Sequence, residues 1–367
     1  MANGLRIALI HGDGIGRDVT DATVKVVDTV LKKIGVPSLS YEQIIAGAGY
    51  YKETGLDIEP GGIERAGDAD AIFLGAIGLP SIRHDDGTEI SPHLRIRDQF
   101  GLYAGIRPVK AYPNAPQRLA DRRARQIDLV ILRESTEGLF YSAAANGRSD
   151  IRGDDEVRDI LRITRPTTEK LHRFGFRLAE RRKKLGHAGI LTCVDKANVF
   201  ASMAFFRKIF DEIATEFPDV TAGYNYVDAQ ALDLVRRPWD FDVLVMENMF
   251  GDILSDLAGG LVGGMGIASC GEIGDEHGLF QPAHGSAPDI MGQDKANPLA
   301  AILSGALMLD YLYEKSGNDG YADAALLINN AVQKGFEQSQ LSPMEFGGDM
   351  GTKAVTEKIV AILEDGL

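Results

Sequence analysis

The chain has little of what secreted, membrane and nucleic-acid-binding proteins rely on. Its 367 residues include only two cysteines, Cys193 and Cys270, too few for a disulfide framework and consistent with a reducing cytoplasm. No run of about 18 apolar residues could span a membrane, and the apolar stretch at the amino terminus is too short for a signal peptide. The net charge of -14 disfavours a broad nucleic-acid interface, which needs a basic face. We therefore expect a soluble, cytoplasmic protein that binds neither membranes nor nucleic acids.

What the sequence does contain is a succession of short apolar runs separated by helical patterns. The runs lack polar alternation, which is typical of strands buried on both faces of a parallel sheet. Between the first two runs, Val19, Val26 and Val30 repeat at helical spacing, and Gly35 ends the pattern. The sequence therefore predicts an α/β fold. The expected strands are residues 5–10, 71–74, 129–132, 189–193 and 243–246, and a second helical pattern covers residues 299–307.

Polar and glycine-rich clusters follow nearly every expected strand. Because ligands of open α/β sheets bind beyond the carboxyl ends of the strands, we expect these clusters to line one crevice. Gly12, Gly14 and Gly16 follow the first strand, but Arg17 breaks the spacing of a Rossmann fingerprint, and a tight turn is the simpler explanation. The glycines of residues 259–266 would let the backbone approach a flat ligand, or would form a hinge.

The segment from Asn248 to Asp256 carries two carboxylates at helical spacing. Asp252 and Asp256 are four residues apart, so a helix places both on one face, where a divalent cation could bridge them. Such a pair is most often a solvated helix face. Here the neighbours Phe250 and Leu254 are apolar, which predicts that the helix faces a core or a cleft. Buried carboxylates need a partner, either a metal or arginine.

Residues 284–289 concentrate groups that suit a nucleotide. His284 supplies a ring, Ser286 a hydroxyl and Asp289 a carboxylate, together with backbone donors. With the acidic pair, this segment suggests that a metal and a dinucleotide meet in one cleft.

In these segments the chain resembles the β-decarboxylating dehydrogenases of the isocitrate and 3-isopropylmalate dehydrogenase family, which includes the D-malate and tartrate enzymes. The resemblance covers essentially the full length, from Gly12 to beyond Asn297. It implies a two-domain, isopropylmalate-dehydrogenase-like α/β fold with a largely parallel central sheet and a dinucleotide site outside the Rossmann pattern. Residues 1–104 and 266–367 would form the cofactor-binding domain. Residues 105–265 would form the substrate and dimerisation domain, with an arm near residues 142–155.

The resemblance assigns the substrate's carboxylates to three arginines. Arg97, Arg107 and Arg133 match the family's malate-binding positions. The assignment is chemically sensible, because guanidinium groups pair bidentately with carboxylates and an acidic protein needs a local basic cluster to hold an anion.

The resemblance also implies a metal site that two subunits share. Lys196 matches the catalytic lysine and Asp228 a third metal-binding aspartate, and in the family both reach into the neighbouring subunit's site. The chain would then be a homodimer, with Asp228, Asp252 and Asp256 holding Mg²⁺ or Mn²⁺. From the residues alone, Lys196 could instead be an ion-pair partner of Asp195.

The resemblance further implies NAD as the cofactor. Asp289 stands where NAD-using members have an aspartate that accepts hydrogen bonds from the adenosine ribose, and a carboxylate would repel the 2′-phosphate of NADP. We expect His284 and Asn297 to contact the adenosine. The expected cofactor-binding residues are Ile15, Gly75, Ala76, Gly266, His284, Gly285, Ser286, Ala287, Asp289, Ile290 and Asn297.

Two positions depart from the family pattern. Phe140 stands at the catalytic tyrosine's place, and Tyr141 beside it is our expected replacement, although neighbours on a strand point to opposite faces. Gln281 replaces a glutamate near the nicotinamide, which changes the local charge but keeps hydrogen-bonding capacity.

Substrate choice is expected to depend on residues before Arg97. Ile90, His93 and Leu94, with Val199 from the partner subunit, should read the C3 substituent, and an apolar lining would favour an alkyl group or hydrogen. We predict NAD- and metal-dependent oxidative decarboxylation of a 2-hydroxy dicarboxylate, with 3-isopropylmalate, D-malate and tartrate left open. A catalytically silent or regulatory family member, and a metal-dependent lyase without redox chemistry, are the alternatives.

Overall fold

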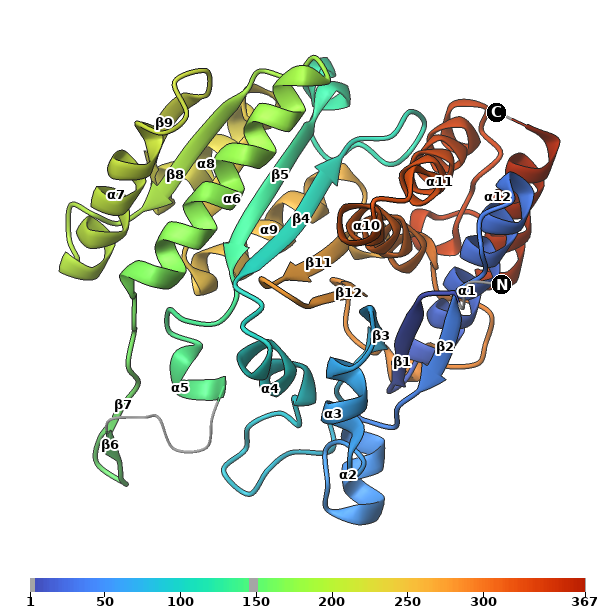
Figure 1. The fold of residues 1–367 in the computed structure, drawn as a ribbon, viewed down its shortest axis with the longest axis horizontal. Helices are drawn as coiled ribbons and strands as arrows, with labels where there is room; N and C mark the ends of the chain where they lie inside the picture. Colours follow the sequence, from blue (N-terminus) through green and yellow to red (C-terminus); the bar gives the residue numbers. More distant parts are fainter. Residues whose placement is uncertain (1–3, 145–150, 367) are drawn as a thin grey trace.

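The computed structural model describes residues 4–144 and 151–366. They form one large mixed sheet with helices on both faces (Figure 1). The strand order is β2-β1-β3-β12-β11-β4-β5-β10-β8-β9. The sheet strands are β1 Arg6–Gly12, β2 Ser40–Gln43, β3 Ala71–Ala76, β4 Ala104–Lys110, β5 Asp128–Glu134, β8 Ile190–Asp195, β9 Thr221–Tyr226, β10 Val243–Met246, β11 Ser269–Ile273 and β12 Gly278–Pro282.

The sheet is largely parallel, as the sequence predicts. At one end β2, β1, β3 and β12 run parallel, and at the other end β5, β10, β8 and β9 do so. Between these blocks, β11 and β4 pair antiparallel with each other and with their outer neighbours. The sheet therefore changes direction in its middle, and this is where side chains from both halves meet.

Helices cover the two halves separately. In Figure 1, α6 and α7 lie over one face of the half that holds β5, β8 and β9, and α8 and α9 lie behind it, while α1, α10, α11 and α12 surround the other half. The helices are α1 Gly16–Ile34, α2 Ala48–Thr54, α3 Gly62–Gly67, α4 Pro92–Gln99, α5 Tyr141–Ala144, α6 Arg165–Lys184, α7 Ala201–Ala214, α8 Val227–Arg236, α9 Asn248–Val262, α10 Leu299–Ser316, α11 Asp319–Glu337 and α12 Thr352–Asp365.

The alternation of side chains along β1 divides the core. Ile7 and Leu9 join the large apolar cluster with α1 and α10, whereas Ala8 and Ile10 point the other way into a smaller cluster beneath α3 and α4. Both faces of the strand are therefore buried, which explains its unbroken apolar sequence. All five strands expected from such runs are present, with ends that differ by up to two residues. Helix α1 ends at the predicted Gly35, which adopts the left-handed conformation (φ 72°).

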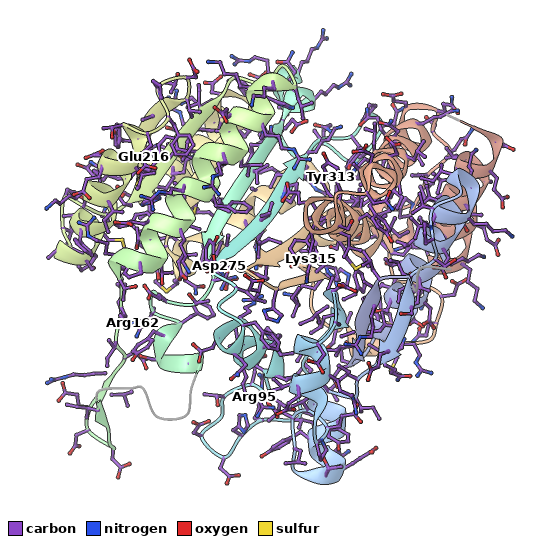
Figure 2. All side chains as sticks on the ribbon, viewed as in Figure 1. Arg95, Arg162, Glu216, Asp275, Tyr313 and Lys315 are labelled. Atoms are coloured by element: carbon purple, nitrogen blue, oxygen red, sulfur yellow. The ribbon has the colours of Figure 1, made fainter. Side chains whose placement is uncertain are left out.

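The turn between β11 and β12 is tied to helices from both halves. Lys170 of α6 forms an ion pair with Asp275, and Lys315 of α10 donates to the Glu276 carbonyl (3.3 Å). Figure 2 shows Asp275 between α6 and α10.

The structure describes only residues 142–144 and 151–155 of the expected arm, and residues 145–150 lie outside the described part. The described residues include the two-residue strand β6 Ile151–Arg152, which pairs with β7 Val157–Arg158. In the described part of the chain, no helix has the length and apolar character to cross a membrane.

Candidate active site

A pocket of about 270 Å³ opens where the two halves of the sheet meet. Its walls come from α4, β4, β5 and α9, and from the ends of β3 and β12. Two of the expected polar clusters, after β3 and at the end of β5, contribute to it, whereas Asp195 and Lys196 do not line it within one chain. The lining residues are Ala76, Ile77, Glu89, Ser91, His93, Leu94, Arg97, Arg107, Arg133, Phe140, Asp252, Asp256, Gln281, Pro282, Ala283, His284 and Gly285.

Three buried arginines lie at the base of this pocket. Arg97, Arg107 and Arg133 come from α4, β4 and β5, and their exposed fractions are 4%, 7% and 2%. Burial, together with the positive charge of Arg107, lowers the pKa of Arg133 to about 10. The Nε atoms of Arg97 and Arg107 have no hydrogen-bond partner among the described residues. The structure thus brings the three predicted arginines together and leaves N–H donors that an anionic ligand could use.

The two aspartates of α9 face the arginines. Asp252 forms an ion pair with Arg133, and Arg107 lies 3.8 Å from Asp252 and 3.7 Å from Asp256. The expectation that this helix faces a core or a cleft is confirmed, because both carboxylates line the pocket, with side chains that are 42% and 57% exposed. Leu254 and Leu261 of α9 pack into the core, whereas Ile253 is 59% exposed and the acidic pair lies at the pocket mouth. Of the two partners expected for the carboxylates, a metal or arginine, the chain itself supplies arginine.

Helix α9 is fixed in place by its first residues. Glu247 caps the helix by accepting from the backbone N–H groups of Met249 (3.1 Å) and Phe250 (3.2 Å). One turn later, a Cβ on Gly251 would lie 2.6 Å from the Cβ of Arg133. Glycine therefore lets α9 approach β5 closely, and Asn248 then accepts from Arg133 Nε at 2.9 Å. These contacts hold the acidic pair against the arginines.

Lys196 and Asp228 lie together outside the pocket of their own chain. Lys196 lies in the loop before α7 and Asp228 in the first turn of α8, and their side chains form an ion pair. The alternative that Lys196 pairs with Asp195 is wrong, because Asp195 is engaged by Arg207 at 2.7 Å. Val199 nearby is 60% exposed. In the described residues of one chain no group of three His, Cys, Asp or Glu side chains could hold a metal, so Asp228 does not join Asp252 and Asp256 within one subunit.

Phe140 and Tyr141, the expected replacement for the family's catalytic tyrosine, lie in different surroundings. Phe140 lines the pocket beneath Arg133, whose guanidinium lies 4.8 Å from the ring centre. Tyr141 is the first residue of α5, and its ring stacks on Arg162 at 4.0 Å; among the described residues, it is Phe140 and not Tyr141 that lines the pocket. The two neighbouring rings therefore have different surroundings, and a catalytic role for Tyr141 stays a prediction.

The lining near the expected C3 position is more polar than predicted. His93 and Leu94 face the pocket, but Ile90 is only 1% exposed and packs inside, so Glu89 and Ser91 on either side of it line the pocket instead. The expectation of an apolar lining with Ile90 is therefore wrong. Burial, with Arg97 and Arg133 nearby, lowers the pKa of His93 to about 3, so its ring is neutral at physiological pH.

One group of the predicted cofactor residues meets where two turns pack together. Ile15 donates its N–H to the Ser286 carbonyl (2.7 Å), and a Cβ on Gly14 would lie 1.9 Å from that same oxygen. The buried carboxylate of Asp13 organises the adjoining turns by accepting from Gly78, Ala48 and Gly49. The turn glycines are thus required for the contact between residues 12–16, 75–78 and 284–287. The sequence offered no specific indication of the role of Asp13.

A second group gathers around Glu345, which the sequence did not indicate. Glu345 accepts from Gly266 N (3.0 Å) and from Asn297 Nδ2 (2.9 Å). The buried His284 Nε2 has no partner among the described residues. Asp289 is exposed in a short 3₁₀ helix, Pro288–Ile290, while Ile290 packs against the core. Of these residues, His284 lines the pocket, and the cofactor role of the group stays a prediction.

Comparison with known proteins agrees with this arrangement. The isocitrate/isopropylmalate dehydrogenase family model matches residues 6–360. The chain belongs to this family. The 3-isopropylmalate/3-methylmalate dehydrogenase of Methanocaldococcus jannaschii is 40% identical over 357 residues, covering 96% of this chain and 97% of that protein. The 3-isopropylmalate dehydrogenase of Heyndrickxia coagulans is 36% identical, covering 98% and 97%.

Solved structures of the family share the fold. Isocitrate dehydrogenase from Methylococcus capsulatus superposes with a TM-score of 0.83 at 32% identity, covering 98% of this chain and 99% of that one. A β-decarboxylating dehydrogenase from Thermococcus kodakarensis gives a TM-score of 0.77 at 36% identity, covering 98% and 96%. As a member of the isocitrate/isopropylmalate dehydrogenase family, the protein is a β-decarboxylating dehydrogenase, an oxidoreductase that acts on a CH–OH group and decarboxylates a hydroxy acid.

Proposed function

We propose that the protein catalyses the NAD- and divalent-metal-dependent oxidative decarboxylation of a malate-type 2-hydroxy dicarboxylate. The observation that carries this proposal is the meeting, in one pocket, of three buried arginines with the acidic pair of α9. Guanidinium groups suit the two carboxylates of the substrate, and carboxylates suit the cation that would hold its hydroxyl. 3-Isopropylmalate, D-malate and tartrate all have this common part.

A divalent cation fits the acidic pair when a second subunit contributes. Asp252 and Asp256 supply two oxygen ligands that are accessible from the pocket, and an oxygen-rich set is what Mg²⁺ or Mn²⁺ prefers. The side chain of Asp228 is 68% exposed and that of Lys196 beside it is 24% exposed, so a neighbouring molecule could reach the carboxylate fully and the ammonium group in part. We therefore propose a homodimer whose subunits exchange Lys196, Val199 and Asp228. We also propose that residues 105–265 form one domain and residues 1–104 and 266–367 the other, since the sheet changes direction near residues 104 and 266.

The cofactor would lie across the turns that border the pocket. The close packing of residues 12–16 on residues 284–287 provides backbone groups without bulky side chains, and the unpartnered His284 Nε2 is a buried ring nitrogen that a nucleotide could engage. Exposed Asp289 would accept from ribose hydroxyls and repel a 2′-phosphate, which favours NAD. If Asp289→Lys left the preference for NAD over NADP unchanged, this assignment would be wrong.

The residues of the chain then divide the chemistry between them. The arginines hold both carboxylates and so fix the direction in which the single hydrogen of C2 leaves as hydride. Lys196 of the second subunit would take the hydroxyl proton. A divalent ion would polarise the hydroxyl and stabilise the negative charge that develops as CO₂ leaves. Reprotonation of the resulting carbon needs an acid, and Tyr141 is the predicted one.

The polar lining near His93 bears on substrate choice. Glu89, Ser91 and neutral His93 would leave a bulky alkyl group beside unpaired polar atoms. We therefore propose that hydrogen, hydroxyl or methyl at C3 is preferred over isopropyl.

The deciding experiment is a panel of malates that differ at C3, assayed with NAD and Mn²⁺ while NADH and CO₂ are followed together. Equal release of both products supports the proposal. Protein that binds NAD and Mn²⁺ yet turns over no malate would support the silent alternative, and CO₂ release without NAD would support a lyase.

A further inference from the structure

Besides Asp252 and Asp256, a third carboxylate, that of Glu272, lies against the three arginines from inside the protein. It belongs to β11 and is 0% exposed, and its Oε1 lies 2.9 Å from Arg97 Nη2. Burial alone would raise the pKa of Glu272, but Arg97, Arg107 and Arg133 hold that pKa below its usual value. Glu272 is therefore ionised and gives the arginine cluster a permanent negative charge.

The backbone around Glu272 makes room for this carboxylate. On the neighbouring strand β4, a Cβ on Gly105 would lie 2.8 Å from Glu272 Oε2 and 2.6 Å from Ser135 Oγ. The glycine thus opens the space that the carboxylate occupies. Arg97 Nε and Arg107 Nε have no hydrogen-bond partner among the described residues. The arginines therefore keep donors for a ligand, although one of their charges is already balanced.

We propose that Glu272 is a specificity-determining residue that lowers the charge of the arginine cluster so that it matches a substrate with two carboxylates and disfavours a third. The inference rests on the proposed function, which assigns the arginines to the substrate and Asp252 and Asp256 to the metal. With those two aspartates so engaged, three positive charges and one negative charge remain to face the substrate. Since Glu272 is buried, solvent screens its charge only weakly, and its effect on an anion a few ångströms away exceeds that of a surface charge.

The test measures the binding of unreactive anions, so it does not depend on turnover. Succinate and propane-1,2,3-tricarboxylate are titrated by calorimetry into the full-length protein in saturating Mg²⁺, so that Asp252 and Asp256 are engaged as the inference requires, at pH 8, where both anions are fully ionised. In the wild type, we expect the tricarboxylate to bind no tighter than succinate. In Glu272→Gln, the ratio of the two dissociation constants should shift about tenfold toward the tricarboxylate, equivalent to about 1.4 kcal/mol.

Two further variants separate charge from structure. Glu276→Gln removes the same charge from an exposed position in the following turn, and we expect the wild-type ratio. Glu272→Asp keeps the charge with a shorter side chain and should also keep that ratio.

Three results would overturn the inference. The first is wild-type protein that binds the tricarboxylate at least tenfold tighter than succinate. The second is an unchanged ratio of the two dissociation constants in a folded Glu272→Gln protein. Failure of both anions to bind any of the proteins would instead remove the proposed substrate class, and the inference with it.

Discussion

Replacing Glu247 by alanine should destabilise the protein at the point where the acidic helix begins. This side chain is 1% exposed and accepts three backbone N–H groups, from Leu139 (3.0 Å), Met249 (3.1 Å) and Phe250 (3.2 Å). Loss of a helix cap costs about 1 kcal/mol, and each buried N–H left without a partner costs about 1–3 kcal/mol. Since water can reach part of the opened space, we expect a total loss of about 3–5 kcal/mol.

The free energy of unfolding is measured by urea titration with circular dichroism. For a chain of this length, the expected loss lowers the melting temperature by roughly 5 °C. Glu247→Gln is the matched control, because it keeps one acceptor oxygen in a side chain of the same shape, and it should lose less than half as much. A loss below 1 kcal/mol in Glu247→Ala, or equal losses in both variants, would refute the capping argument.

Three further predictions concern acid stability, metal binding and protonation. Burial lowers the pKa of His172 from 6.5 to about 3, so the unfolded chain binds one more proton than the folded one as the pH falls below 6.5. Between pH 7 and pH 5 the unfolding free energy of His172→Leu should therefore fall by about 2 kcal/mol less than that of the wild type. An identical fall in both proteins would contradict this. Asp252→Asn should abolish the increase in melting temperature that Mn²⁺ gives the wild type, whereas exposed Asp323→Asn should keep it; an undiminished increase in Asp252→Asn would place the metal elsewhere. If Tyr141 is the proton donor, Tyr141→Phe should lower kcat at least tenfold with little change in KM, and Phe140→Tyr in that background should restore activity; full activity of Tyr141→Phe would exclude the role.

The parts of the fold that the sequence predicted are those whose pattern depends on local burial. Strands β1, β3, β5, β8 and β10 are buried on both faces, so continuous apolar runs mark them. The edge strands β2 and β9 are partly exposed and show no such run. Strands β4, β11 and β12 carry glycine, proline or charged residues, which interrupt the apolar pattern at the centre of the sheet.

The site divides in the same way. The arginines, the acidic pair and the residues around His284 could be identified because motifs close in sequence carry them. Glu272 could not, since its partners Arg97 and Arg107 are more than 160 positions away and a charged residue in a strand normally indicates exposure. The orientation of Ile90 depends on the path of a loop before α4, and the loop showed no periodicity from which to predict it.

The central claim is that each active site combines Asp252 and Asp256 of one subunit with Asp228 of another, and complementation tests it most directly. Asp228→Asn and Asp252→Asn proteins should each be inactive alone. In a heterodimer, one of the two sites receives an intact Asp252 and an intact Asp228, so co-expression of the two chains should restore about a quarter of wild-type activity. If the co-expressed chains form mixed dimers but show no more activity than either variant alone, the shared site is contradicted.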